Sequence, residues 1–363
     1  MRKLASIQQV RSIHPIEGKD RIVLAEVLGW TVIVQKDEYK PGDKCIYVEV
    51  DSVLPEKPEF EFLRKKDFRI KTMKMAGVLS QGICFPLSLL PQGDYEVGDD
   101  VTDILGVTKY DEYADEVRQD SKQPKSPLRQ FMFRHRITRP LAKLIWTPTR
   151  RERDGFPDFV SKTDETRIQN IPHILENKEI KWVGREKIDG QSGTFFLRRI
   201  RNPLPFLPDR FEFGVCSRNR RLMADDNSSF WQVARKYNLR SVLREMIGDS
   251  DWVCIQGEVI GPKIQSNKYH VSETDLYCFN LIYPGRKVPC HTAEIAVGLH
   301  GLKWVPLVVK DYTLPDTVSE LLDFATGQSA LYPDLREGIV FRNYETGQSF
   351  KAVSNDFLLK HKL

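Results

Sequence analysis

The chain has 363 residues, of which 29% are charged and 40% hydrophobic, and its mean hydropathy is −0.41. This length is enough for two domains with separate cores, and no stretch approaches the roughly 20 apolar residues that span a bilayer. The first residues lack the apolar stretch of a secretory signal peptide. The six cysteines form no CxxC motif and no zinc-binding spacing, which favours reduced thiols. These features argue against a membrane or secreted disulfide-rich protein and predict a cytoplasmic one, and nothing in the sequence indicates a protein partner.

Positive charge is concentrated in one part of the chain. The net charge is +5, but the segment from 118 to 153 contains eleven Lys and Arg residues and only two acidic residues, Asp120 and Glu152. Aromatic residues interrupt the basic ones around Arg134, Arg136 and Arg139. Such a pattern is typical of a surface that follows a phosphate backbone and stacks on bases. We therefore expect these three arginines to bind nucleic acid; at individual positions, a solvated connector whose aromatics pack on a neighbouring domain fits equally well.

Residues 1–108 are predicted to be all-β. Short β-rich runs alternate with turn sequences such as Lys40-Pro41-Gly42-Asp43. About five strands in about a hundred residues favour a small closed barrel of the OB type over a sandwich. An SH3-like barrel is the alternative that the pattern leaves open. The predicted strands are 5–10, 21–28, 30–34, 44–50, 69–75 and 82–85.

The rest of the chain is predicted to form a basic connector, 109–175, followed by an α+β domain, 176–363. A helix is expected at 228–237, capped by Asp226 or Asn227, because its apolar residues recur on one face. Two more helices are expected at 241–247 and 317–325. The predicted strands are 181–185, 194–198, 211–216, 252–260, 276–282, 338–342 and 350–353.

The sharpest motif is Glu186-Lys187-Ile188-Asp189-Gly190, which directly follows a predicted strand. On its own, this motif also fits an ordinary surface turn. Further chemically active side chains, however, stand near the ends of later strands. Acidic, aromatic and basic groups ordered around one lysine predict a pocket between two sheets. These residues are Glu258, Phe279, Glu337 and Lys351.

In this order, the motifs resemble those of the covalent nucleotidyltransferases, which include ATP-dependent RNA and DNA ligases and capping enzymes. Lys187 fits the nucleophile motif of that superfamily, and Arg218 fits the second motif. The sequence is similar above all to Deinococcus-type nick-sealing RNA ligases, which place an OB module before the nucleotidyltransferase domain. The resemblance implies that 176–363 is an α+β nucleotidyltransferase domain of the ATP-grasp-like ligase/capping-enzyme superfamily. The blocks that carry the closer likeness are 70–75, 79–83, 162–170 and 256–269.

The resemblance implies that Lys187 attacks the α-phosphorus of ATP. The amine must be neutral to do so, although the reference pKa of lysine is about 10.4. A pKa lowered by about 3 units corresponds to about 4 kcal/mol, which Lys351 and a bound Mg²⁺ or Mn²⁺ would supply. Glu258 and Glu337 are the expected metal ligands. In the same reading, Phe279 stacks on adenine, Glu186 accepts from its amino group, and Asp189 and Gly190 complete the nucleotide site.

The family's reaction then transfers AMP to a 5′-phosphate and joins that end to a 3′-hydroxyl, with RNA at the 3′-hydroxyl side. The expected partner is RNA or a nicked RNA-containing duplex, with Arg218 contacting the ribose or the 3′ end; an ion pair of Arg218 with Asp225 or Asp226 is the alternative. The superfamily's last motif is commonly Lys-x-Lys, but only Lys351 is present here, with Lys360 as a candidate second cation.

Two other functions remain open. A capping-type guanylyltransferase would use the same lysine chemistry but is disfavoured by the N-terminal position of the OB module. A non-catalytic nucleic-acid-binding protein would keep the fold with an inactive pocket. The barrel itself is expected either to bind the nicked duplex or to orient the pyrophosphate.

Overall fold

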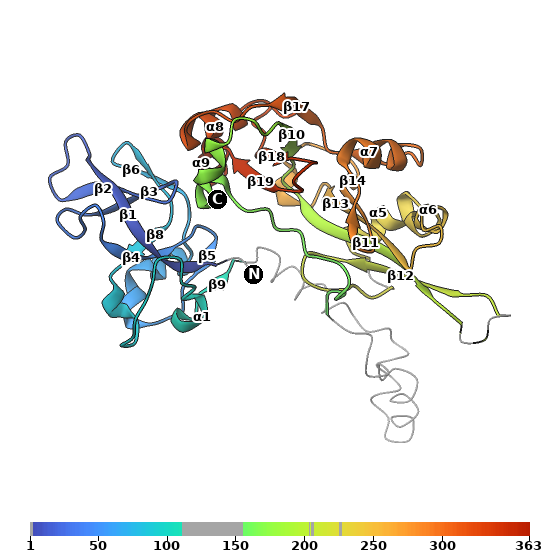
Figure 1. Ribbon diagram of the computed structural model, residues 1–363, viewed down its shortest axis with the longest axis horizontal. Coiled ribbons are helices and arrows are strands. Elements are labelled where there is room, and N and C mark those ends of the chain that lie inside the picture. The colour runs from blue at the N-terminus through green and yellow to red at the C-terminus, as the bar shows by residue number, and fades with distance from the viewer. Residues whose placement is uncertain (1–2, 111–154, 203, 205–206, 225–226) are drawn as a thin grey trace, which may run out of the picture. The chain divides into compact units, whose positions relative to one another are not determined.

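The computed structural model describes residues 3–110, 155–202, 204, 207–224 and 227–363 (Figure 1). The chain forms two compact units. The first contains Met1–Tyr110, Thr163–Ser192 and Ile255–Leu363, and the second contains Asp111–Lys162 and Gly193–Cys254. Most of the predicted basic connector, including Arg134, Arg136 and Arg139, lies outside the described residues.

The N-terminal part of the first unit is an antiparallel five-stranded sheet with the order β3-β2-β1-β4-β8 (Figure 1). The long strand β1 pairs with both β2 and β4, and its register shifts between Val10 and Ser12. A bulge of this kind bends a strand, which lets β1 serve both sides of a barrel. The five strands are β1 (Ala5–Pro15), β2 (Ile22–Val27), β3 (Trp30–Gln35), β4 (Lys44–Val48) and β8 (Ile83–Phe85).

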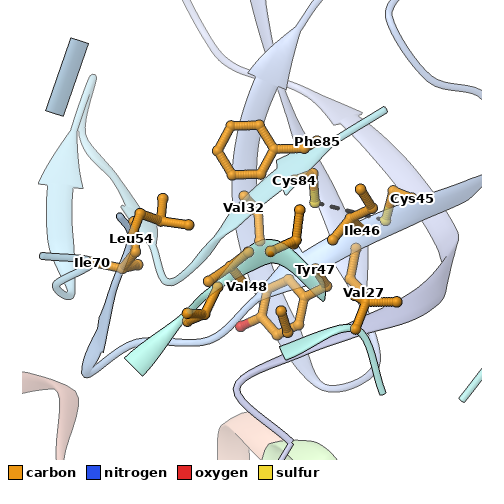
Figure 2. Packing of buried hydrophobic residues seen from close by; sticks show 14 of the residues in the cluster. Val27, Val32, Cys45, Ile46, Tyr47, Val48, Leu54, Ile70, Cys84 and Phe85 are labelled. Carbon is orange, nitrogen blue, oxygen red and sulfur yellow. Dashed lines mark hydrogen bonds between the residues drawn. The ribbon is translucent and has the colours of Figure 1, made fainter. Parts of the chain in front are cut away.

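The barrel encloses an apolar core (Figure 2). Side chains alternate between buried and partly exposed along β3, so that Trp30, Val32 and Val34 point inward. The thiols of Cys45 and Cys84 lie 3.8 Å apart in this core. All six cysteines are free and buried, in keeping with the prediction of reduced core thiols.

Shorter elements complete the barrel. The predicted strand 69–75 forms only over its last three residues, since Asp67 and Phe68 adopt left-handed backbone angles just before it and the chain turns there. The other short elements are β5 (Ser52–Val53), η1 (Pro58–Lys66), β6 (Met73–Met75), β7 (Val78–Ser80), η2 (Leu87–Leu89), α1 (Thr102–Leu105) and β9 (Thr108–Lys109).

A second sheet in the first unit has the strand order β17-β10-β18-β19. Its core packs against α8 (Val318–Ala325), which Thr317 begins with a capping box. The rings of Trp182 and Phe350 meet edge to face at 4.9 Å in this core. The strands are β17 (Leu307–Tyr312), β10 (Trp182–Lys187), β18 (Gly338–Arg342) and β19 (Ser349–Val353).

In the rest of the first unit, β14 pairs with β15 and β16, and α7 packs on β14. Several elements of this unit were not expected from the sequence, among them α7, α9 and β17. The apolar residues of α7 form no clear stripe, and β17 is an edge strand without buried positions. The remaining elements are η3 (Ile168–Asn170), η4 (Pro172–Glu176), η5 (Gln265–Asn267), β14 (Asp275–Tyr283), β15 (Arg286–Lys287), β16 (Lys303–Trp304), α7 (Cys290–Gly298) and α9 (Asn355–His361).

The second unit contains a hairpin of β11 and β12 with two helices. The chain crosses between units within β11 (Gln191–Ile200) and β13 (Trp252–Ile260). β12 (Arg210–Cys216) pairs with β11 along its whole length, and α5 (Ser229–Lys236) packs on β12 beside α6 (Leu239–Met246). The predicted cap of the first helix was wrong: Ser228, not Asp226 or Asn227, is the N-cap, and its hydroxyl accepts from the Trp231 amide.

The observed fold is mixed α+β, with an N-terminal OB-like barrel, which confirms the predicted class. The residue boundaries of the three predicted segments stay a prediction. Within the described ranges, no helix combines the length and apolar character needed to cross a bilayer.

Candidate active site

The candidate site is built on the register between β10 and β18. Lys187 is the last residue of β10 and stands opposite Gly338, so that Glu337 lies directly beside it. The Lys187 Nζ atom is 2.6 Å from Oε2 of Glu337, and the two side chains are 26% and 12% exposed. The pairing of β10 with β18 therefore brings these two residues together, although 150 residues separate them along the chain.

The electrostatics of this pair favour the charged form of the lysine. Burial acts to lower the pKa of Lys187, but the nearby carboxylates of Glu337, Glu258 and Asp189 outweigh it and hold the pKa above its ordinary value. Burial also raises the pKa of Glu337, against the opposing effect of Lys187. The lowered pKa that nucleophilic attack requires is thus not a property of these side chains alone.

Glu258 reaches the site from β13. Its Oε1 accepts a hydrogen bond from the Gly190 amide at 3.1 Å, so the glycine of the motif holds a carboxylate that the sequence predicted nearby. A Cβ atom at position 190 would lie 2.4 Å from the Val259 carbonyl oxygen. The close approach of the motif to β13 is the physical reason for a glycine at this position.

Asp189 is held by two neighbours from one loop. The Lys268 ammonium pairs with Oδ2 of Asp189, and the Tyr269 hydroxyl accepts from the Asp189 amide at 2.7 Å. Three consecutive residues before them, Gln265–Asn267, adopt left-handed φ values of 48°, 56° and 50°. This conformation is costly for residues other than glycine, and such backbone strain concentrates at functional sites.

Glu186 has a different environment from its neighbour. It is only 2% exposed, and its two oxygens accept from the Ser329 hydroxyl and the Ala330 amide. Burial raises its pKa, partly offset by these bonds. In this geometry Glu186 anchors the loop that carries Ser329; the predicted contact with an adenine amino group stays a prediction.

Lys351 and Phe279 are held through the chain segment that follows residue 163. The Lys351 amide donates to the Thr166 carbonyl at 2.8 Å, and its ammonium lies 3.4 Å from Oδ1 of Asp164. The Phe279 carbonyl accepts from Arg342 at 2.7 Å, and Arg342 also contacts Glu165. This segment therefore helps to position two residues that the sequence assigned to nucleotide binding.

Arg218 belongs to the second unit, where it is exposed in the turn after β12. Its proposed ion-pair partners, Asp225 and Asp226, lie outside the described residues, as do the three arginines of the basic segment. The roles predicted for these arginines stay predictions.

Sequence reasoning missed the residues that position the site. Lys268, Tyr269 and Asp164 fall in the blocks 256–269 and 162–170, whose likeness to RNA ligases was the available signal. Arg342 follows the Glu337 motif at the end of β18, and its contact with Phe279 depends on two strands meeting. No local pattern indicates that contact.

Two carboxylates suit a Mg²⁺ or Mn²⁺ ion. In the described part of the chain, no group of three His, Cys, Asp or Glu side chains is arranged to hold a metal. Magnesium, however, is usually bound through one or two carboxylates together with water and substrate phosphates. Glu258 and Glu337, which both act on the charge of Lys187, fit this mode of binding.

Two parts of the chain match models of known protein families. Residues 180–353 match an RNA ligase family model, and residues 4–87 match an OB-fold domain. A structure of Naegleria gruberi RNA ligase with PPi is 31% identical, with a TM-score of 0.78, and the match covers 100% of this chain and 99% of that one. No curated protein matches the chain.

Structures of variants of the Naegleria enzyme are equally similar. One variant with ATP and Mn is 31% identical with a TM-score of 0.78, over 99% of this chain and 98% of that one. Another, with AMP and Mn, is 31% identical with the same TM-score, over 99% of both chains. The chain therefore belongs to the RNA ligases, and it is one with an N-terminal OB-fold domain.

Proposed function

We propose that this RNA ligase seals 3′-hydroxyl/5′-phosphate breaks through a covalent AMP on Lys187, with RNA at the 3′-hydroxyl side, as the Deinococcus-type nick-sealing enzymes do. It is ATP-dependent, and ATP with manganese bound to a variant of the Naegleria relative supports this choice of nucleotide. The observation that carries the proposal is the ion pair of Lys187 with Glu337, in which Nζ and Oε2 are 2.6 Å apart. Lys187 begins the motif Lys187-Ile188-Asp189-Gly190, whose glycine amide donates to Glu258.

In the first step, the lone pair of Lys187 Nζ attacks the α-phosphorus of ATP. A nitrogen–phosphorus bond forms, the bond from the α-phosphorus to the bridging oxygen breaks, and pyrophosphate leaves. Nζ must first lose a proton, and Oε2 of Glu337 is the acceptor that already contacts it. Lys351 would donate to the α-phosphate and offset the negative charge that develops there.

A divalent metal held by Glu258 and Glu337 would supply the positive charge that lowers the pKa of Lys187. Without it, these same carboxylates hold that pKa above its ordinary value. In this proposal, the positive charge of the metal therefore has to outweigh these carboxylates before Lys187 can react.

The next two steps use the adenylated enzyme. A 5′-phosphate oxygen attacks the phosphorus of lysyl-AMP, which frees Lys187 and gives an adenylylated 5′ end. The 3′-hydroxyl then attacks the 5′-phosphorus, and AMP leaves. In this proposal, Phe279 stacks on adenine, Asp189 and Gly190 shape the nucleotide site, and Arg218 contacts the ribose or the 3′ end.

Label transfer tests the covalent step. With α-labelled ATP and Mg²⁺ or Mn²⁺, we expect labelled protein from the wild type and none from Lys187→Arg, because a guanidinium is not deprotonated in proteins. Lys44→Arg, an exposed lysine paired with Glu96, is the matched control. Labelling by GTP rather than ATP would instead support a capping-type guanylyltransferase. Absence of label with either nucleotide would support the non-catalytic alternative.

Nicked duplexes that vary RNA against DNA on each side test the substrate. We expect joining to require ribose at the 3′-hydroxyl end and to tolerate DNA elsewhere. Equal joining of all-DNA nicks would contradict the RNA part of the proposal.

We also propose that the basic segment binds RNA through Arg134, Arg136 and Arg139. Replacing all three by glutamine should weaken RNA binding and reduce the slope of log affinity against log salt by about 2 to 3. Lysyl-AMP formation should be unchanged. An unaltered slope would show that the segment is a solvated connector.

A further inference from the structure

Two loops that contact the nucleophile motif carry aromatic rings that stack on each other. The ring centroids of His270 and Tyr332 are 4.3 Å apart, and the ring planes differ by 28°. His270 is exposed and Tyr332 is partly exposed. We call these two residues the aromatic pair. None of the roles described for the nucleotide site involves either ring, so the pair is an accessible aromatic surface without an assigned partner molecule.

The first loop places His270 close to Asp189. The Tyr269 hydroxyl accepts from the Asp189 amide at 2.7 Å, which ties the residue before His270 to the motif. The Asn267 side chain donates to the Val271 carbonyl and accepts from the Val271 amide, both at 3.0 Å. The His270 amide donates to the Asn267 carbonyl at 2.9 Å. The loop is therefore closed around His270 by its own hydrogen bonds.

The backbone of this loop is strained at the position of the ring. His270 has a φ of 50°, and the three residues Gln265–Asn267 also have left-handed φ values. Histidine adopts this conformation more readily than most residues, but four such residues within six are unusual. Backbone strain persists only where the surrounding structure enforces it, and it clusters at active sites and ligand-binding loops. The loop thus gives up stability to hold the His270 ring where it lies.

The second loop places Tyr332 close to Glu186. The Ala330 amide donates to Oε2 of Glu186 at 2.9 Å. The Ser329 amide donates to the Asp334 carbonyl, and the Asp334 amide donates to the Tyr332 carbonyl, both at 2.7 Å. Each ring of the aromatic pair is therefore carried by a hydrogen-bonded loop that is joined to the motif.

The ammonium groups near the aromatic pair already have carboxylate partners. Lys268 pairs with Asp189, and Lys360, the candidate second cation of the last motif, pairs with Asp334. Burial and these two ammonium groups lower the pKa of His361, so this side chain is largely uncharged at neutral pH. The surroundings of the pair therefore suit the face of a base better than a phosphate.

Stacking on aromatic side chains is a common way to bind a base that is not enclosed in a continuous helix. Histidine and tyrosine both serve in this role for RNA. Such stacking contributes about 1–3 kcal/mol per base and tolerates any sequence, because every base has a π-face. Rings that are held in place before binding lose less conformational entropy when a base arrives.

We propose that the aromatic pair binds a nucleobase of the RNA beside the break, with the more exposed His270 ring against the face of the base. The proposal deepens the proposed function, on which it rests for the identity of the substrate. It assigns the two residues to RNA binding and not to the chemical steps.

Binding of a nicked duplex with RNA at the 3′-hydroxyl side tests the pair. Fluorescence anisotropy with the full-length protein in EDTA measures the affinity while no bond forms. His270→Ala and Tyr332→Ala should each weaken binding roughly 5- to 30-fold. His270→Phe and Tyr332→Phe keep a ring and should bind nearly as the wild type does. The control is His291→Ala, at an exposed histidine of α7, which should bind as the wild type does.

Duplexes that lack one base identify the nucleotide that stacks. The base is removed either from the 3′-hydroxyl nucleotide or from the 5′-phosphate nucleotide of the break. On the duplex that lacks the stacked base, the wild type should bind more weakly, and His270→Ala should cause no further loss. Either position supports the proposal and tells which end of the break the pair holds.

The proposal is overturned if His270→Ala binds the intact duplex as His291→Ala does. It is also overturned if His270→Ala weakens binding of the intact and both abasic duplexes equally, because the rings would then only hold the two loops together. Neither measurement depends on catalysis. A protein that forms no lysyl-AMP but shows the base-dependent loss would refute the proposed function and keep the stacking site.

Discussion

The barrel and the β17-β10-β18-β19 sheet bury different kinds of side chain. The barrel core consists of apolar side chains, chiefly valine, isoleucine, leucine and aromatic residues, together with the thiols of Cys45 and Cys84 (Figure 2). By contrast, Glu186 at the end of β10 is 2% exposed, and Glu337 just before β18 is 9% exposed. Lys187, the last residue of β10, forms an ion pair with Glu337. Burying charge costs free energy unless partners offset it. The difference teaches that the sheet gives up stability where it carries chemistry, while the barrel mainly provides it.

The largest expected effect concerns the charged region, by which we mean Glu186, Lys187 and Glu337. Glu337→Gln removes the carboxylate nearest the nucleophile and should lower the rate of lysyl-AMP formation about 100- to 1,000-fold. Single-turnover labelling measures this rate. Glu345→Gln, an exposed glutamate between β18 and β19, is the control and should leave it unchanged. A Glu337→Gln enzyme that reacts at the wild-type rate would remove this residue from the site.

A substitution in the barrel core should act on stability instead. Ile46 is fully buried, and Ile46→Ala should reduce the free energy of unfolding by about 2–5 kcal/mol in urea titrations. Well below the unfolding midpoint, lysyl-AMP yield at saturating ATP should stay near the wild-type level. Ile104→Ala, at 47% exposure, should change stability by less than about 0.5 kcal/mol. Loss of labelling in folded Ile46→Ala protein would contradict the division between the two regions.

Glu186 should give the charged region a pH signature. Its pKa is raised by burial in the folded protein, so the folded state binds more protons than the unfolded state above the ordinary glutamate range. The free energy of unfolding should therefore fall as pH rises from that range through the raised pKa, by at most about 1.4 kcal/mol per pH unit. Urea titrations across pH 4 to 7 measure the slope. Glu186→Gln should be flatter, and equal slopes in both proteins would contradict the assignment.

The smallest effect is expected at a helix cap, that of α8. Thr317 and Glu320 form the capping box of α8, which packs on the second sheet. Thr317→Ala should destabilise the protein by about 1 kcal/mol in the same titrations. The neighbouring exposed Ser319→Ala is the control, and an equal effect of both changes would show that the cap contributes nothing specific.

Much of the fold was predictable because its signals are local. The β-rich run 30–34 and the helix expected at 317–325 correspond to β3 and α8. The turn residues Lys40–Asp43 lie between β3 and β4 as expected. α7 was missed because Cys290, Ala293 and Val297 are its buried residues, too small and mixed with other residues to form a visible stripe.

For the site, the sequence predicted a set of candidate residues but not the contacts that hold them in place. Lys187, Glu258 and Glu337 stand in short recognisable motifs. The Lys268–Asp189 pair depends on three left-handed residues that no propensity favours, and the Lys109–Asp164–Lys351 contact depends on a strand of the barrel meeting the segment after residue 163. Such contacts arise from tertiary structure and leave no local pattern.

The segment 164–170 also limits how the protein can be divided. On one side, its Glu165 bonds to Ser349. On the other, Gln169 and Asn170 bond to Gly29 and Trp30. A shortened protein that starts at position 171 would lose the backbone partner of Lys351 as well as the barrel. Its catalytic defects would then be wrongly credited to the barrel, so dissection of this enzyme should retain the segment in every fragment.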